Sequence, residues 1–484
     1  MPAHMTADNE ELCYLSAGEA IARFTDGSLS PVDVLQAQIA RSERVEPQVN
    51  AFTETWFDEA LAQAKAAEQR YRRGDQRPLE GLTLAVKDEF KLAGKRRTSA
   101  SLVYRDQIDD ESDVLIQRLL DAGAIPHAKT ATPEFCLLGS CHSRLWGVTS
   151  NPWNLDITPG GSSGGAGASL AAGTTTIATG TDIGGSIRIP SSFCGVAGYK
   201  PPYGRNPEIP VFNLDFYSHS GPMARNVADL AAMQNIISGV HNRDIASLRQ
   251  QVIIDTTIPP NLDGWKIAWS MDLGFMEVDS SVRANTLAAL DVMRGLGAEI
   301  EEVEIGWDES IVTAVHHYWA QVWGSTMTPL LDDHRSELCD YTIWFLENSF
   351  GTTARDYSAS LEKAVEMYDR FGPLMDDYDL FVCPTLMTTG VRNDASWPTS
   401  DVEINGEIRQ VAEEYWSATF PFNMLSRCPV LSVPSGLAAN GVPTGIQMVA
   451  RTYDDQRVFS AALAYEQAFQ RPPFQLDKRI DLGD

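Results

Sequence analysis

The stretches PGGSSGG at residues 159–165 and GTDIGGSIRIP at residues 180–190 decide how this chain is interpreted. Glycine has no Cβ atom, so glycines beside serines let backbone amides and hydroxyl groups come close together without side-chain bulk. The surrounding segment, 158–198, mixes isoleucine, phenylalanine, valine and arginine into its glycine, serine and threonine in non-repeating order. Flexible linkers are instead polar and repetitive. We therefore predict tightly turned, packed backbone in this segment.

The first stretch can be compared with three known glycine motifs. A phosphate-binding loop requires Gly-Lys-Ser/Thr, which is missing, and a dinucleotide-binding loop requires a third glycine where Leu170 stands. The nucleophile elbow G-x-S-x-G is formally present at 161–165, but in hydrolases it directly follows a strand. Residues 151–159 contain proline and asparagine turn signals and little β character. None of the three motifs therefore accounts for this stretch.

The second stretch favours an oxyanion hole, in which backbone amides stabilise the negative charge that develops on a substrate carbonyl oxygen. Two glycines before a serine leave room for four consecutive amides to converge on that oxygen. In known hydrolases one such donor is worth roughly 3–4 kcal/mol. The four amides belong to Ile183, Gly184, Gly185 and Ser186.

A serine hydroxyl is a poor nucleophile unless a nearby base takes its proton. The chain has eight histidines, but none lies in a glycine-rich or strand-end context and none forms His-Glu-x-x-His. The apolar run 82–86 predicts a buried strand that ends at Lys87. A lysine held away from water can rest uncharged and accept a proton. Lys87 is therefore the candidate base.

These blocks together resemble the amidase signature family of serine hydrolases. The resemblance includes Ala-Val-Lys-Asp at 85–88 and both glycine-serine stretches, and it extends from the N-terminal helices to Val-Pro-Ser-Gly at 433–436. It implies that Ser186 is the nucleophile and that Ser162, preceded by a cis peptide bond from Gly161, relays the proton. Lys87 would accept that proton and return it to the leaving nitrogen. Water would complete the reaction, so neither a metal nor an organic cofactor is implied.

The resemblance also implies supporting residues and a pocket. Three side chains would orient the relay and brace the loop, namely Ser163, Asp182 and Arg188. Three positions would line the acyl pocket, namely Cys136, Leu138 and Gly139. The chain departs from the family at Ala131, where asparagine is common, and at Thr83, where proline is common. Neither departure touches the three catalytic positions.

Helical and strand patterns alternate along the rest of the chain, which predicts a layered α/β core. Residues 310–375 are expected to form a helical, aromatic-rich region over the substrate, although aromatics at helical spacing more often belong to a core. The resemblance implies a mixed, twisted central sheet flanked by helices on both faces. It also implies a single domain over 1–484 with its core signature at 80–240. The expected helices and strands lie at 59–73, 114–122, 125–129, 266–269 and 300–303.

Composition limits the possible partners and surroundings. The chain has 65 acidic against 38 basic residues, a net charge of −27, so nucleic acid and anionic membranes are not expected partners. Its seven cysteines are scattered without a Cys-x-x-Cys pair, which fits a reducing compartment. The first 14 residues do not resemble a signal peptide, and no apolar run approaches the ~20 residues of a membrane helix. We expect a cytoplasmic protein.

The expected function is hydrolysis of carboxylic amide C–N bonds through an acyl-Ser186 intermediate, on apolar or aryl amides. Two alternatives stay open. The first is a urethane (carbamate) or ester hydrolase, because the same serine and oxyanion hole serve any acyl group. The second is a glutaminase like the amidase subunit of the glutamyl-tRNA amidotransferase, although the acidic surface disfavours a transfer RNA partner. The expected partners are a small-molecule amide or carbamate and water, with a homodimer possible.

Overall fold

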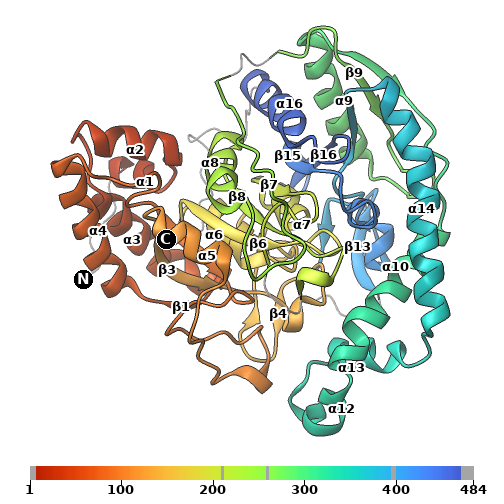
Figure 1. Cartoon of the computed structure of the whole chain (residues 1–484), viewed down its shortest axis with the longest axis horizontal. Coiled ribbons are helices and arrows are strands. Elements are labelled where there is room, and N and C mark those ends of the chain that lie inside the picture. Colours follow the sequence, from red (N-terminus) through yellow and green to blue (C-terminus); the bar gives the residue numbers. More distant parts are fainter. Residues whose placement is uncertain (1–6, 209–211, 258–260, 394–398, 470–484) are drawn as a thin grey trace.

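The computed structural model describes residues 7–208, 212–257, 261–393 and 399–469. Strand β2 shows how the layers arise, because successive side chains on a strand point to opposite faces of the sheet. Leu84 and Val86 pack into a core with α5 and α8, whereas Ala85 packs into another core with α6. Both faces of the sheet are therefore covered by helices (Figure 1). The elements are β2 (Thr83–Lys87), α5 (Val114–Asp121), α6 (Gly164–Ala172) and α8 (Val227–Ile237).

The central sheet has 11 strands in the described residues and is mixed. β2 runs parallel to β3 and β6, and β9 runs parallel to β10 and β11, while the middle of the sheet is antiparallel. The expected mixed sheet flanked by helices is thus confirmed. In spatial order the other strands are β1 (Phe52–Thr55), β3 (Ile125–Thr130), β6 (Ile177–Thr181), β8 (Ser220–Ala224), β7 (Ala197–Lys200), β15 (Val430–Leu437), β16 (Pro443–Val449), β11 (Leu380–Pro384), β9 (Lys266–Trp269) and β10 (Glu299–Glu302).

The glycine-rich segment folds as packed backbone, as predicted. It supplies α6, β6 and α7 (Arg188–Cys194), and every residue of both helices is buried. Between β6 and α7 the chain turns at Gly185, whose φ of 135° lies in a region that other residues rarely adopt. A Cβ atom there would also collide with the side chain of Thr419. Only glycine fits this turn.

Two of the N-terminal helices begin at a serine cap. Ser16 and Ser30 each form a capping box, the second with Pro31 at the first helical position. The helix expected at 59–73 starts two residues earlier, and the strand expected at 300–303 starts one residue earlier. The helices are α1 (Ala7–Leu12), α2 (Ala17–Thr25), α3 (Pro31–Val49) and α4 (Phe57–Arg73).

The aromatic region from 310 onward is helical, as expected, and α14 runs along one side of the molecule (Figure 1). Tyr318 is fully buried in the main core, while Phe350 is exposed. Some aromatic side chains of this region therefore belong to the core and others do not. The elements are α10 (Ser310–Trp319), a π-helical turn η4 (Ala320–Gly324), α11 (Ser325–Met327), α12 (Pro329–His334), η5 (Arg335–Glu337), α13 (Asp340–Ser349) and α14 (Ala354–Asp377).

Shorter elements complete the chain. They are η1 (Leu102–Tyr104), η2 (Glu134–Cys136), β4 (His142–Ser143), β5 (Gly147–Val148), η3 (Phe212–Leu214), α9 (Ser280–Gly295), β12 (Gly390–Val391), β13 (Ser400–Ile404), β14 (Glu407–Val411), η6 (Glu413–Tyr415), α15 (Pro421–Met424) and α16 (Asp455–Ala468). All seven cysteines are free thiols. Within the described ranges no helix has the length and apolarity needed to span a bilayer.

Candidate active site

Lys87, the last residue of β2, lies on the same face of the sheet as Ala85, toward α6. Its side chain is fully buried. Its Nζ is 2.8 Å from the Oγ of Ser162 in the turn before α6, and 2.6 Å from the Oγ1 of Thr181 at the end of β6. The Gly161–Ser162 peptide bond is cis, as the resemblance implied. The ends of β2 and β6 and the turn before α6 therefore meet, and Lys87 and Ser162 form a direct hydrogen bond.

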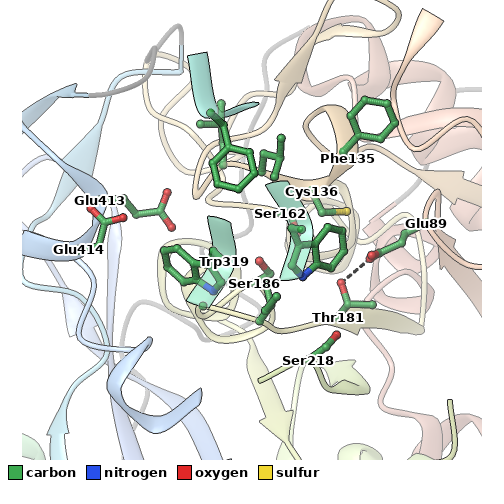
Figure 2. A pocket seen from close by; sticks show the side chains of 16 residues that line it. Glu89, Phe135, Cys136, Ser162, Thr181, Ser186, Ser218, Trp319, Glu413 and Glu414 are labelled. Carbon is green, nitrogen blue, oxygen red and sulfur yellow. Dashed lines mark hydrogen bonds between the residues drawn. The ribbon is translucent and has the colours of Figure 1, made fainter. Parts of the chain in front are cut away.

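Ser186 lies in the turn between β6 and α7 and is 7% exposed. A backbone hydrogen bond from Ser163 N to Ser186 O (3.1 Å) ties this turn to the one that carries Ser162. Both serines line one cavity, together with Ile183 and Gly184 (Figure 2). The structure therefore places the predicted nucleophile, the relay serine and part of the predicted oxyanion loop on a common wall.

The turn between β6 and α7 is braced by a buried ion pair. Arg188 donates to both carboxylate oxygens of Asp182 at 2.9 and 2.8 Å, and both side chains are fully buried. Burial alone would raise the pKa of Asp182, but the guanidinium beside it holds this pKa down at about 2. The remaining donors of Arg188 bind Thr419 O, Gln447 Oε1 and Asn423 Oδ1. Asp182 also accepts from Ile187 N, so the pair fixes the path of the backbone on both sides of Ser186.

Ser163, the third supporting residue, has a more local role. Its Oγ accepts a hydrogen bond from Thr181 N at 3.3 Å and lies 3.4 Å from Thr181 O. This contact ties the start of α6 to the end of β6. Ser163 therefore braces the two turns without lining the cavity in the described structure.

The cavity beside Ser186 has a volume of about 60 Å³ and mostly apolar walls. Of the predicted pocket residues, Cys136 and Leu138 line it, whereas Gly139 does not. Sequence reasoning missed further apolar lining residues, among them Trp319 on α10, Trp323 on the π-helical turn η4 and Phe345 on α13. Only their position in an aromatic helical segment signalled a pocket.

A second cavity of about 440 Å³ adjoins the first. Four residues line both cavities and so form the boundary between them, namely Glu89, Phe135, Cys136 and Trp323. The outer cavity extends between residues 97–107 and the helical region at 322–330. We call the cavity lined by Ser186 the inner cavity and the larger one the outer cavity.

Two glutamates that the sequence did not single out, Glu413 and Glu414, line the inner cavity on the side away from Glu89 (Figure 2). Glu413 accepts a hydrogen bond from Gly139 N at 2.6 Å, and a Cβ atom at Gly139 would collide with the Glu413 carboxylate. Burial, reinforced by the neighbouring Glu414 carboxylate, raises the pKa of Glu413 to about 8. Glu414 pairs with His316 at 2.9 Å.

Histidines stand apart from the serines. None of the residues that line the inner cavity is a histidine. His219 is buried nearby, but its two ring nitrogens contact the backbone oxygens of Asp182 and Ser426, and burial lowers its pKa to about 3. Across the described ranges, no three His, Cys, Asp or Glu side chains are grouped so as to hold a metal ion. The hydroxyl and ionisable side chains that line the inner cavity therefore belong to serines, a threonine, a cysteine and glutamates.

Known proteins share this architecture over nearly the whole chain. The sequence profile described as Amidase matches residues 33–459. An acylamidase of Rhodococcus erythropolis is 34% identical over 471 residues, which cover 96% of this chain and 96% of the relative. A glutamyl-tRNA(Gln) amidotransferase subunit of Geobacter metallireducens is 31% identical over 486 residues, with coverages of 95% and 98%.

Among solved structures, a bacterial aryl acylamidase of the amidase signature enzymes superposes with a TM-score of 0.89 at 27% identity. The similar region covers 97% of this chain and 99% of that chain. The likeness therefore includes the outer helices as well as the site.

The buried ion pair predicts a large stability effect. Asp182→Asn removes the charge that compensates Arg188, and breaking a buried pair from one side typically costs about 3–5 kcal/mol. We expect denaturant titrations to show a decrease of that size in the free energy of unfolding. Asp291→Asn, which breaks an exposed pair with Arg294, serves as control and should cost below about 0.5 kcal/mol. Equal, small losses in both variants would show that the pair does not brace the turn.

Glu413 predicts a pH-dependent effect. Because its folded pKa of about 8 lies above the ordinary value of 4.5, the folded state retains a proton that the unfolded state releases, and stability falls as pH rises from 4.5 to 8. Glu413→Gln keeps an acceptor for Gly139 N and removes this dependence. The melting temperature of the variant minus that of the native protein should therefore increase between pH 5 and 8 and then level off.

The control for this measurement is Glu43→Gln, a change at an exposed position on α3. It should leave the melting temperature difference nearly constant over the same range. A Glu413→Gln difference that does not vary with pH would contradict the assigned protonation of this carboxyl group.

Proposed function

The chain belongs to the amidase family, and from this membership we propose that it is a serine amidase that cleaves carboxylic amides through an acyl-Ser186 intermediate. The observation that carries the proposal is the contact between Lys87 Nζ and Ser162 Oγ, 2.8 Å apart, because Ser162 and Ser186 line the same cavity. A buried amine and an intermediate hydroxyl form the base that a serine nucleophile needs. The similarity to an acylamidase and an aryl acylamidase supports the same activity.

The proposed first half-reaction transfers the acyl group to Ser186. Its Oγ attacks the amide carbon while its proton passes to Ser162 Oγ, and Ser162 passes its own proton to the uncharged amine of Lys87. The carbonyl electrons move onto oxygen, where the amides at 183–186 stabilise the negative charge. When the carbonyl re-forms, the C–N bond breaks, and the proton on Lys87 returns through Ser162 to the leaving nitrogen. The amine leaves neutral.

The second half-reaction repeats the relay with water. Water attacks the ester at Ser186 and gives a proton through Ser162 to Lys87. The carboxylic acid then leaves as the Ser186 oxygen regains that proton through Ser162. Every proton that is taken up is returned, so the enzyme is unchanged after one cycle.

The relay also orients the substrate. The leaving nitrogen receives its proton from Ser162, so it must face the side of the cavity on which Lys87 and Glu89 lie. Glu89 is at the boundary with the outer cavity, and we place the amine portion there. The acyl portion then points toward Trp319 and Glu413.

The volumes suggest the size of each portion. An apolar cavity of about 150 Å³ holds a benzene molecule, so the inner cavity of about 60 Å³ admits only a short acyl group unless side chains move. The outer cavity of about 440 Å³ accommodates an aromatic amine. We therefore propose N-acyl arylamines with short acyl groups as the preferred substrates. Carbamates and esters undergo the same attack at Ser186, and a substrate panel separates them by kcat/KM.

The glutaminase alternative fits the cavity less well. Glutamine carries an ammonium and a carboxylate on its acyl portion, and a buried carboxylate needs a cationic partner. The residues that line the inner cavity include no arginine or lysine. Glu413 and Glu414 instead occupy the acyl side. The site therefore supports an uncharged acyl portion over glutamine.

The assigned nucleophile predicts that Ser186→Ala lowers kcat by roughly 10⁴-fold or more, as loss of the serine does in other serine hydrolases. Hydrolysis of an N-acyl nitroanilide measures the rate. Mass spectrometry after brief exposure to a nitrophenyl ester should find the acyl group on the peptide that contains Ser186.

Ser192→Ala is the matched control. Like Ser186, this serine is buried, and it lies on α7. Its hydroxyl has no hydrogen-bond partner among the described residues. The control should stay within about threefold of the native rate, since little is lost on removing an unpaired hydroxyl. Substantial turnover by folded Ser186→Ala protein would rule out the proposed nucleophile.

The lack of a lysine or arginine among the described residues on the acyl side predicts discrimination between two substrates of similar size. N-butyryl 4-nitroanilide should have a kcat/KM roughly 100-fold above that of N-succinyl 4-nitroanilide, because the succinyl carboxylate finds no cation in the inner cavity. Equal rates, or measurable release of ammonia from glutamine, would favour the glutaminase alternative instead.

A further inference from the structure

Glu89 contacts the candidate base but was not part of the expected relay. It lies two residues after Lys87, and its Oε2 is 3.3 Å from Lys87 Nζ. Thr181 Oγ1 donates to the same carboxylate oxygen at 2.5 Å (Figure 2). It also accepts from Lys87 Nζ at 2.6 Å. The Glu89 side chain is 13% exposed, at the boundary between the two cavities.

These contacts surround the Lys87 amine with oxygen atoms. An ammonium group has three N–H donors and no acceptor. Lys87 Nζ has three oxygen neighbours, on Ser162, Thr181 and Glu89, and one of them belongs to a carboxylate. The sequence predicted an uncharged base, held neutral by burial. The structure adds an anion beside that base, and an opposite charge at this distance stabilises the ammonium form.

We infer that Glu89 is a positioning residue that sets the pH range in which Lys87 can act as a base. This inference rests on the proposed amidase mechanism and goes beyond it. Glu89 holds the amine of Lys87 between Ser162 and Thr181, and its carboxylate faces that amine with an opposite charge.

The other titratable groups around this pair carry no competing charge at the ammonium. Cys136 and Cys141 lie near Lys87, but burial raises the pKa of their thiols to about 12 and about 11, so both stay neutral. The Asp88 carboxylate accepts instead from Thr98 N at 3.0 Å. Glu208, close enough to interact with Glu89, has a pKa that burial raises to about 8. Among the described residues, Glu89 is the one carboxylate paired with Lys87.

The test is the pH profile of kcat/KM, which reports the ionisations of the free enzyme. Glu89→Gln keeps the size and an acceptor oxygen but removes the charge. We expect the acid limb of this profile to move to lower pH by about one unit or more. Glu89→Asp keeps the charge, but its side chain is one methylene shorter, so the carboxylate lies farther from Lys87 Nζ. The acid limb of this variant should move in the same direction by a smaller amount.

An acid limb that stays in place in folded Glu89→Gln protein would overturn the inference. A raised KM with an unmoved limb would also overturn it, because this result would mean that Glu89 binds the substrate. If Glu89→Gln does not fold, Thr181→Val is the second variant. It leaves the carboxylate in place, removes one acceptor from the ammonium, and should also move the limb downward. An unmoved limb in that variant counts equally against the inference.

The outcome is independent of the nucleophile assignment. If Ser186→Ala is inactive while the acid limb of the Glu89 variants is unmoved, the inference about Glu89 fails and the proposed amidase mechanism stands. If Ser186→Ala remains active, the mechanism itself fails whatever the Glu89 variants show.

Discussion

The buried pair of Arg188 and Asp182 is the constraint on which the site depends. Taking two charges out of water is costly, and the cost is recovered only when every hydrogen-bond group of both side chains finds a partner. Arg188 meets this condition by reaching Thr419, Asn423 and Gln447, which lie between 231 and 259 residues further along the chain. The turn that holds Ser186 is therefore fixed by segments that are far apart in the sequence.

A second constraint acts on the relay itself. Lys87 must be buried to lie beside Ser162, yet an isolated ammonium inside a protein is strongly disfavoured. The hydroxyl of Thr181 and the carboxylate of Glu89 resolve this conflict by supplying the oxygens that water would otherwise provide. One group of side chains therefore both compensates the burial of Lys87 and fixes the position of its amine.

Short-range patterns made much of this predictable. The strand ending at Lys87, the caps at Ser16 and Ser30, and the packed glycine-rich turns all follow from local rules about periodicity, caps and glycine. Glu89 was visible in principle, because it comes two residues after a strand-end lysine. Glu413 and Glu414 were not, because their places depend on tertiary contacts: Glu413 binds Gly139, 274 residues away in the chain, and Glu414 pairs with His316. The divided cavity likewise depends on how the helical region lies over the sheet.

The boundary formed by Phe135, Trp323 and their neighbours bears on the order of events during turnover. In the proposed mechanism the amine leaves through the outer cavity, and water reaches the acyl ester through the space that the amine has vacated. Any small nucleophile that enters the vacated outer cavity, such as hydroxylamine, competes with water for attack on the acyl ester. In the proposed mechanism, the concentration of free amine therefore decides whether the acyl group passes to water or to another nitrogen.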